Sequence, residues 1–265
     1  MTPVRSDLRR FAVRAAVAAA LVLAGAALVG CETFGDTTGS IRPAATAASP
    51  STETDLRAYA EACHARYDRD PGEKSASIEY AQALRSLART SEAVAVMQAA
   101  AVRAPKDEEV LGEYGKALAD AGELAQAKDV LTRADTPDNP KWDVLSAQGA
   151  VADRMGDHEA AMQFYRDALK IAPDEPGVLT NMGLSLALAK RLPEAERALR
   201  QAALSPKAGA TTRGDLALVL ALEGKYAEAE KIGETDLSPE AARANVEAVK
   251  RIVARGGVPR ELPSG

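Results

Sequence analysis

The stretch WDVLSAQGAVADRMGDHEAAMQFYRDALKIAPDE, residues 142–175, is 34 residues long, and its small residues recur along the chain at that spacing. One row contains only alanine: Ala93, Ala127, Ala161, Ala195 and Ala229. A second row lies twelve residues earlier in each period: Ala81, Gly115, Gly149, Gly183 and Ala217. Because alanine is abundant in this chain, one row could arise by chance, but two independent rows indicate an internal repeat.

This period and pattern resemble the tetratricopeptide repeat, a helix-turn-helix unit in which small residues lie where the two helices cross closely. The resemblance covers about residues 74–233 and implies repeat starts near Lys74, Glu108, Trp142, Pro176 and Ala210. The low aromatic content, 4%, independently favours closely packed alanine-rich helices. The predicted fold is therefore all-α, a right-handed α-solenoid of about five helix pairs with an extra helix at each end.

The turns and the ends of the array show where the pattern departs from a regular repeat. Gly122, Gly156 and Gly224 fall at the turn between helices, where Ala88 and Lys190 are the exceptions. In the fifth repeat, Gly233 occupies a position that is large in the other repeats, so its second helix should be short. Ser238-Pro239 is a helix start, with serine as cap and proline in the first turn, and it predicts a closing helix to about Val253.

The first thirty residues have the layout of a signal peptide, since four arginines precede an apolar run from Ala15 to Val29. That run is shorter than the roughly 20 residues of a membrane span. Leu28-Val29-Gly30-Cys31 resembles the lipobox of bacterial lipoproteins, which implies cleavage before Cys31 and attachment of lipid to its sulfur. Residues 32–54 lack periodicity and are rich in Thr, Ser, Ala, Pro and Gly, so they are expected to form a flexible tether.

These observations predict six segments along the chain. They are a lipoprotein signal peptide (1–30), a lipidated tether (31–53), an N-terminal capping helix (54–72), the repeat solenoid (73–236), a C-terminal capping helix (237–254) and a disordered tail (255–265).

Charge and residue types limit the classes of function. Loss of residues 1–30 would change the net charge from −5 to −8, because that segment has four arginines and one aspartate. Nucleic acid is therefore not an expected partner.

The two histidines, His64 and His158, lie far apart and no metal-ligand cluster is apparent. No catalytic motif occurs either, so neither an enzyme nor a cofactor nor a small-molecule substrate is expected. Cys63, without a mate once Cys31 is acylated, should be a small, partly buried side chain on a helix.

The repeat family binds partners in a concave groove lined by its first helices, at the second, fifth, ninth, twelfth and thirteenth positions of each repeat. Carried onto this sequence, these positions are polar in the first three repeats and include Gln82, Arg85, Lys116 and Arg154. In the last two repeats they are apolar: Leu184, Ala187, Leu188, Leu218, Ala221 and Leu222.

Two interpretations of the leucines remain open. An exposed apolar patch could receive an amphipathic partner segment. Alternatively, the closing helix at 239–253 could fold back over them, with Val246, Val249 and Val253 as its buried stripe.

Beyond the generic repeat, the chain resembles the TadD family of repeat lipoproteins, which belong to the tight-adherence (Flp) pilus assembly system. The stretches that carry this resemblance are VLGEYGKALADAGELAQAKDVLTRA, WDVLSAQGAVADRMGDHEAAMQFYRDALKIAPDEPGVLTNMGLSLALA and LALVLALEGKYAEAEKI. It implies a protein-binding scaffold that helps the secretin ring localise or multimerise.

Glu32 follows the lipidated cysteine where an aspartate would retain the protein at the inner membrane of enteric bacteria, so the periplasmic side of the outer membrane is expected. Alternatives are another lipoprotein scaffold, in outer-membrane protein insertion or polysaccharide export, an envelope enzyme or its dedicated subunit, and a periplasmic pilin chaperone.

Overall fold

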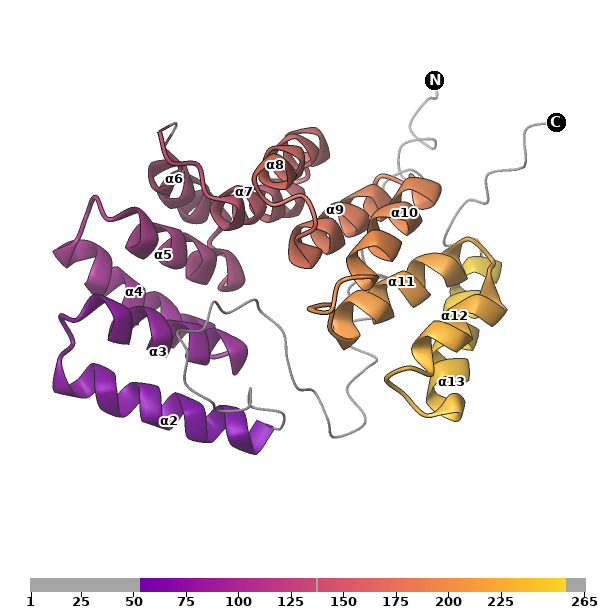
Figure 1. Cartoon of the computed structure of the whole chain (residues 1–265), viewed down its shortest axis with the longest axis horizontal. Helices are drawn as coiled ribbons and strands as arrows, with labels where there is room; N and C mark the ends of the chain where they lie inside the picture. The colour runs from indigo at the N-terminus through magenta and orange to yellow at the C-terminus, as the bar shows by residue number, and fades with distance from the viewer. Residues whose placement is uncertain (1–52, 137, 256–265) are drawn as a thin grey trace, which may run out of the picture. The chain divides into compact units, whose positions relative to one another are not determined.

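A computed structural model describes residues 53–136 and 138–255, and within them it contains twelve α-helices and no strand (Figure 1). The helices are α2 (Glu53–Arg69), α3 (Lys74–Ser86), α4 (Thr90–Arg103), α5 (Glu108–Asp120), α6 (Leu124–Ala134), α7 (Trp142–Arg154), α8 (His158–Ile171), α9 (Pro176–Leu188), α10 (Leu192–Ala203), α11 (Ala210–Leu222), α12 (Tyr226–Gly233) and α13 (Pro239–Ala254). The predicted all-α class is confirmed.

The first helices of the five repeats begin at the five predicted residues: Lys74, Glu108, Trp142, Pro176 and Ala210. Each is followed by a second helix, and α5 packs on α6, α7 on α8 and α11 on α12. Acidic side chains cap several starts, as where Asp107 accepts hydrogen bonds from the backbone amides of Glu109 and Val110 at 3.1 Å. The 34-residue spacing therefore sets the helix boundaries.

The turn between the two helices of a repeat uses a left-handed residue in all five repeats. Gly122, Gly156 and Gly224 have φ of 85°, 85° and 84°. The two exceptions in the sequence keep the same conformation, with φ of 55° at Ala88 and 63° at Lys190. A side chain in this conformation costs about 1 kcal/mol relative to glycine. The backbone of the turn is therefore conserved among the repeats even where the residue is not.

Small residues lie where the two helices of a repeat cross. A Cβ atom added to Gly115 would lie 2.5 Å from Leu131, and one added to Gly149 would lie 2.5 Å from the ring of Tyr165. At Gly183 the corresponding neighbour is Leu199, at 2.6 Å. These large partners are fully buried, so the glycine row and the large row together form the core of each pair.

The described chain divides into two units, residues 53–182 and 183–255, with the division inside α9. In the first unit, α2 packs on α3 and buries Cys63, which is a free thiol. In the second unit, α13 packs on both α11 and α12.

The second helix of the fifth repeat is short, as predicted, because α12 has 8 residues whereas the other second helices have 11 to 14. A Cβ atom on Gly233 would lie 3.2 Å from that of Ala242 in α13. The closing helix therefore approaches the end of α12 closely at this glycine.

The predicted signal peptide, lipid attachment at Cys31 and most of the tether and tail lie outside the described residues. Among the helices that are described, none is both long and apolar enough to cross a membrane.

Candidate protein-binding surface

In the first three repeats, the polar groove positions are joined by ion pairs between successive first helices. Arg85 on α3 lies 2.6 Å from Asp120 and 3.4 Å from Glu113, both on α5. Lys116, also on α5, lies 2.8 Å from Glu113 and 2.6 Å from Asp143 on α7. We call these five residues the ion-pair ladder.

Arg85, Glu113 and Lys116 are largely shielded from solvent, whereas the side chains of Asp120 and Asp143 are about 40% exposed. Burial alone would lower the pKa of Lys116, but Glu113 and Asp143 outweigh it and hold that pKa above its usual value. Burial likewise acts to raise the pKa of Asp143, and Lys116 reverses this and lowers it. Lys116 and Asp143 are therefore charged and paired at neutral pH.

The remaining polar candidates are placed as follows. Arg154 is exposed and donates a hydrogen bond to the backbone carbonyl of Ala119. Gln82 is partly buried on α3. Arg85, Lys116 and Arg154 thus bond to neighbouring first helices of their own chain, and these contacts connect repeats to one another.

The last two repeats have a different lining. Leu184 and Leu188 on α9, and Leu218 and Leu222 on α11, are partly buried and keep some accessible surface with α13 in place. We call these four residues the leucine row. None of these four leucines is among the most exposed large apolar residues, such as Leu204, which is 85% exposed. The row is thus less exposed than an open patch would be.

The other apolar candidates and the closing helix contribute to the core. Ala187 and Ala221 are 3% and 1% exposed, so they support the leucines from beneath and offer little surface to a partner. In α13, Val246 is buried, whereas Val249 and Val253 are only partly so. The closing helix therefore packs on α11 and α12 without fully burying the leucine row.

One functional signal was missed by reasoning from the groove positions alone. The sixth position of each repeat is polar in four of five repeats: Glu79, Glu113, Asn181 and Asp215. Glu79 contacts Arg66 of α2 at 2.5 Å. Glu113 and Asn181 each contact the first helix of the preceding repeat, through Arg85 at 3.4 Å and Ser146 at 3.2 Å. Asp215 has neither a hydrogen bond nor an ion pair to the residues that the structure describes.

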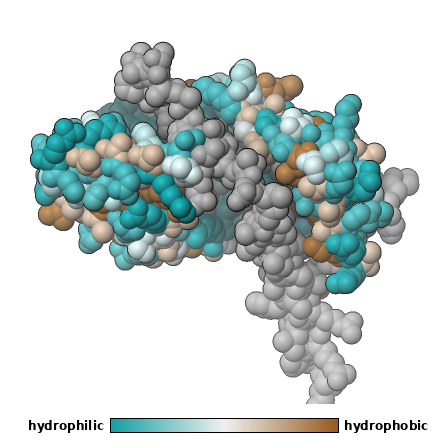
Figure 2. Space-filling model, turned by 90° about the horizontal axis from the view of Figure 1, so that it is seen from below, coloured by the Kyte–Doolittle hydropathy of each residue, from teal (hydrophilic) through white to brown (hydrophobic). Residues whose placement is uncertain are grey.

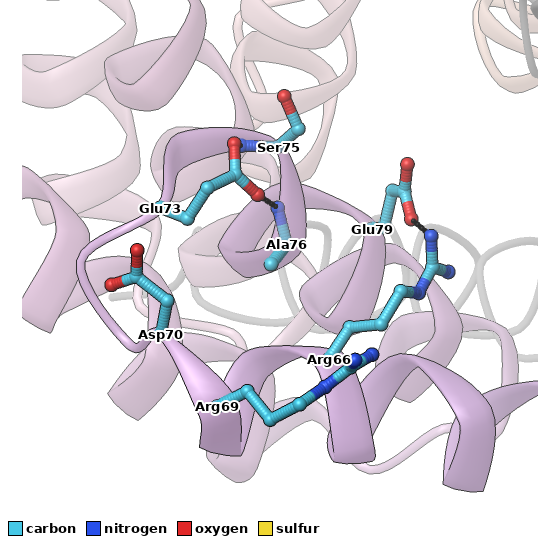
Figure 3. Close-up of a pocket in the computed structure, with 7 residues that line it drawn as sticks. All are labelled: Arg66, Arg69, Asp70, Glu73, Ser75, Ala76 and Glu79. Carbon is cyan, nitrogen blue, oxygen red and sulfur yellow. Dashed lines mark hydrogen bonds and ion pairs between the residues drawn. The ribbon is translucent and has the colours of Figure 1, made fainter.

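A pocket of about 370 Å³ lies between α2 and α3, and its charged lining side chains bond within the chain (Figure 3). Arg66 pairs with Glu79, and Glu73 accepts hydrogen bonds from the amides of Ser75 and Ala76 at the start of α3. Within residues 53–136 and 138–255, no cluster of three metal-ligating side chains occurs. His64 and His158 pair with separate carboxylates, Asp68 and Asp153.

Large apolar side chains on the surface are isolated rather than clustered. Figure 2 shows hydrophobic residues scattered among hydrophilic ones on the face that it presents. Val102 and Leu204 are the most exposed, at 77% and 85%, and each stands near the end of a second helix. Single exposed residues of this kind are ordinary, so the leucine row remains the better candidate surface.

Comparison with known proteins supports the repeat directly. Residues 143–175 match the model of the tetratricopeptide repeat. The chain resembles the structure of the APC/C hetero-tetramer Cut9–Hcn1, with a TM-score of 0.58 and 16% identity over 74% of this chain. It resembles the human IFIT1 dimer with PPP-AAAA, with a TM-score of 0.60 and 16% identity over 77% of this chain. It also resembles Pseudomonas aeruginosa pilF, with a TM-score of 0.53 and 15% identity over 73% of this chain.

The chain covers 40% of the Cut9–Hcn1 chain and 51% of the IFIT1 chain, but 96% of the pilF chain. No curated protein sequence matches it. At these identities the likeness shows the fold alone, and that fold is the tetratricopeptide repeat α-solenoid. Proteins of this fold are in general non-catalytic scaffolds that bind other proteins.

Proposed function

We propose that this chain is an outer-membrane-anchored scaffold that binds protein components of the Tad/Flp pilus during assembly, and that it assists localisation or multimerisation of the secretin. The proposed anchor is lipid on Cys31, on the periplasmic side. The pilus system and the anchor rest on the sequence resemblances to the TadD family and to the lipobox. The activity would be placement of a partner near the membrane, with no covalent step and no cofactor.

The observation that carries the binding role is the leucine row. Four leucines at positions that the family uses for partners keep accessible surface, whereas Arg85, Lys116 and Arg154 in the first three repeats bond within the chain. Apolar surface that remains accessible on a folded domain favours association with another protein. An amphipathic helix laid in the groove would bury it.

The placement role is tested by crosslinking and pulldown from membranes, with the native chain beside Cys31→Ser. We expect the native chain to recover the secretin, and the variant to lose both that partner and pilus assembly. Recovery of pilin in place of the secretin would indicate a chaperone. If partners and pili do not depend on Cys31, tethered placement is wrong.

The binding role is tested by changing Leu184 and Leu218 together to serine. We expect partner recovery to fall while the helical fold persists, because both side chains are only partly buried. The matched control is Leu204→Ser, the same chemical change at an 85% exposed leucine of the same unit. Unchanged partner recovery with reduced thermal stability would show that the leucines only support the fold.

A further inference from the structure

Asp215 lies on the same side of α11 as the two leucines of that helix. Asp215, Leu218 and Leu222 are separated by three and four residues, so their side chains form one stripe along the helix. Gly214, one turn before Leu218, faces open space, since a Cβ atom added there would meet nothing within 4 Å. The carboxylate therefore stands at one end of the apolar stripe, and the neighbouring Gly214 leaves the adjacent face of the helix uncovered.

The carboxylate has no partner of its own. Its Oδ2 atom is buried and accepts no hydrogen bond from the described residues. The nearest cation along the helix, Arg213, is bound to both carboxylate oxygens of Asp236, at 2.5 and 2.6 Å. Burial raises the pKa of Asp215 to about 7, and no neighbouring charge among the described residues opposes this.

Asp215 as a whole is partly buried, but a buried oxygen without a partner is unusual in a native fold, where almost every buried polar atom has one. A wholly apolar segment laid on the leucine row would bury Asp215 further and leave it unpaired, at a cost in binding. An acidic segment would add repulsion. A segment with a lysine or arginine beside its apolar residues would supply the missing partner, because a charge-assisted hydrogen bond is stronger than a neutral one.

We propose that Asp215 determines the specificity of the leucine row, and that it receives a lysine or arginine placed about one helical turn from the apolar residues of a bound amphipathic helix. The inference rests on the proposed function, in that the leucine row must bind a protein segment. It adds the chemistry of that segment, and it separates the basic amphipathic helix from apolar or acidic ones.

The test uses the full chain, purified in mild detergent, and two labelled 18-residue helical peptides. Both peptides have a leucine stripe at i, i+4 and i+7. One has a lysine about one turn beyond each end of the stripe, so that either orientation presents a cation, and the other has glutamine there. We expect the lysine peptide to bind about tenfold more tightly in fluorescence anisotropy. Asp215→Asn should abolish this preference and leave the affinity of the glutamine peptide unchanged.

Two further variants keep the result interpretable. Asp215→Glu retains the charge and should retain the preference. Glu234→Gln removes an exposed charge from the same unit and should not alter the preference. Equal binding of the two peptides to the native chain, or a preference that survives Asp215→Asn, would overturn the inference. In that case binding that is lost in the double leucine-to-serine variant would still support the leucine row as the binding surface. If neither peptide binds, both ideas fail.

Discussion

The two units use the same helix pair but line their groove positions in opposite ways. At the ninth position of the repeat, residues 53–182 contain Lys116, which joins two neighbouring first helices through ion pairs, while residues 183–255 contain Leu184 and Leu218. The ladder satisfies its own charges. The leucine row keeps accessible apolar surface, and Asp215 beside it has no partner among the described residues. The groove positions of the first unit are therefore satisfied within the chain, whereas those of the second unit are suited to binding a partner.

The two units also differ in net charge, with the acidic residues concentrated in the first unit. Residues 53–182 contain 15 Lys and Arg against 24 Asp and Glu, a formal charge of −9, whereas residues 183–255 contain 12 against 10, a formal charge of +2. The acidic unit therefore attracts basic partners at long range, and salt screens this attraction beyond about 10 Å. Short-range recognition should depend on the leucine row instead, since apolar contact is not screened.

The largest expected effect tests what the units share, which is the close crossing of helices within a repeat. Gly149→Ala in one unit and Gly183→Ala in the other should each lower the free energy of unfolding by about 3 kcal/mol, because the added methyl would overlap Tyr165 or Leu199. Chemical denaturation followed by circular dichroism measures this. A neutral result in one unit only would mean that the two units do not share one packing rule.

The variant with the next largest expected effect tests how the groove positions of the two units differ. Lys116→Leu gives the second repeat the residue that the fourth and fifth repeats have at this position. We expect a loss of about 2 kcal/mol in unfolding free energy, because the partly exposed Asp143 would lose its partner and the buried Glu113 would keep only Arg85, at 3.4 Å. Adding Asp143→Asn should recover part of this loss. If Lys116→Leu is neutral, the ladder does not stabilise the array.

The array was predictable because its signals repeat. Five helix starts follow from one 34-residue period, and even the departures at Ala88 and Lys190 keep the left-handed turn. The shortness of α12 was also predictable, since a glycine replaced a large residue at 233. A pattern that recurs in five repeats is little affected by a change in any one of them, and it therefore predicts the helix boundaries well.

The pairing of groove charges was not predictable from the same rows. The ladder joins residues 27, 28 and 35 positions apart, which is near the period but not equal to it. A comparison of equivalent positions therefore placed Arg85 and Lys116 on a binding surface without detecting their partners. Asp215 was missed for a related reason: its row is polar, but only the three-dimensional contacts distinguish the member that has no partner.

A smaller effect concerns pH. The pKa of Asp215 rises from 3.8 to about 7 on folding, so the folded state holds this proton more tightly than the unfolded state does. The stability due to this group is complete below pH 3.8 and is lost as the pH rises towards 7. Asp215→Asn should therefore stabilise the chain more at pH 8 than at pH 5, by about 1 kcal/mol. Equal effects in thermal unfolding at both pH values would mean that the carboxylate is paired or solvated.

The smallest effect has the opposite sign to the largest and uses the same chemical change. Gly214→Ala should raise the free energy of unfolding by about 0.5 kcal/mol, because alanine favours a helix interior and the added methyl meets open space. Gly183→Ala, in the same unit, should be strongly destabilising. Thermal unfolding of the two variants side by side measures the difference. If Gly214→Ala is also destabilising, the space that the added methyl would enter on this face of α11 is already filled.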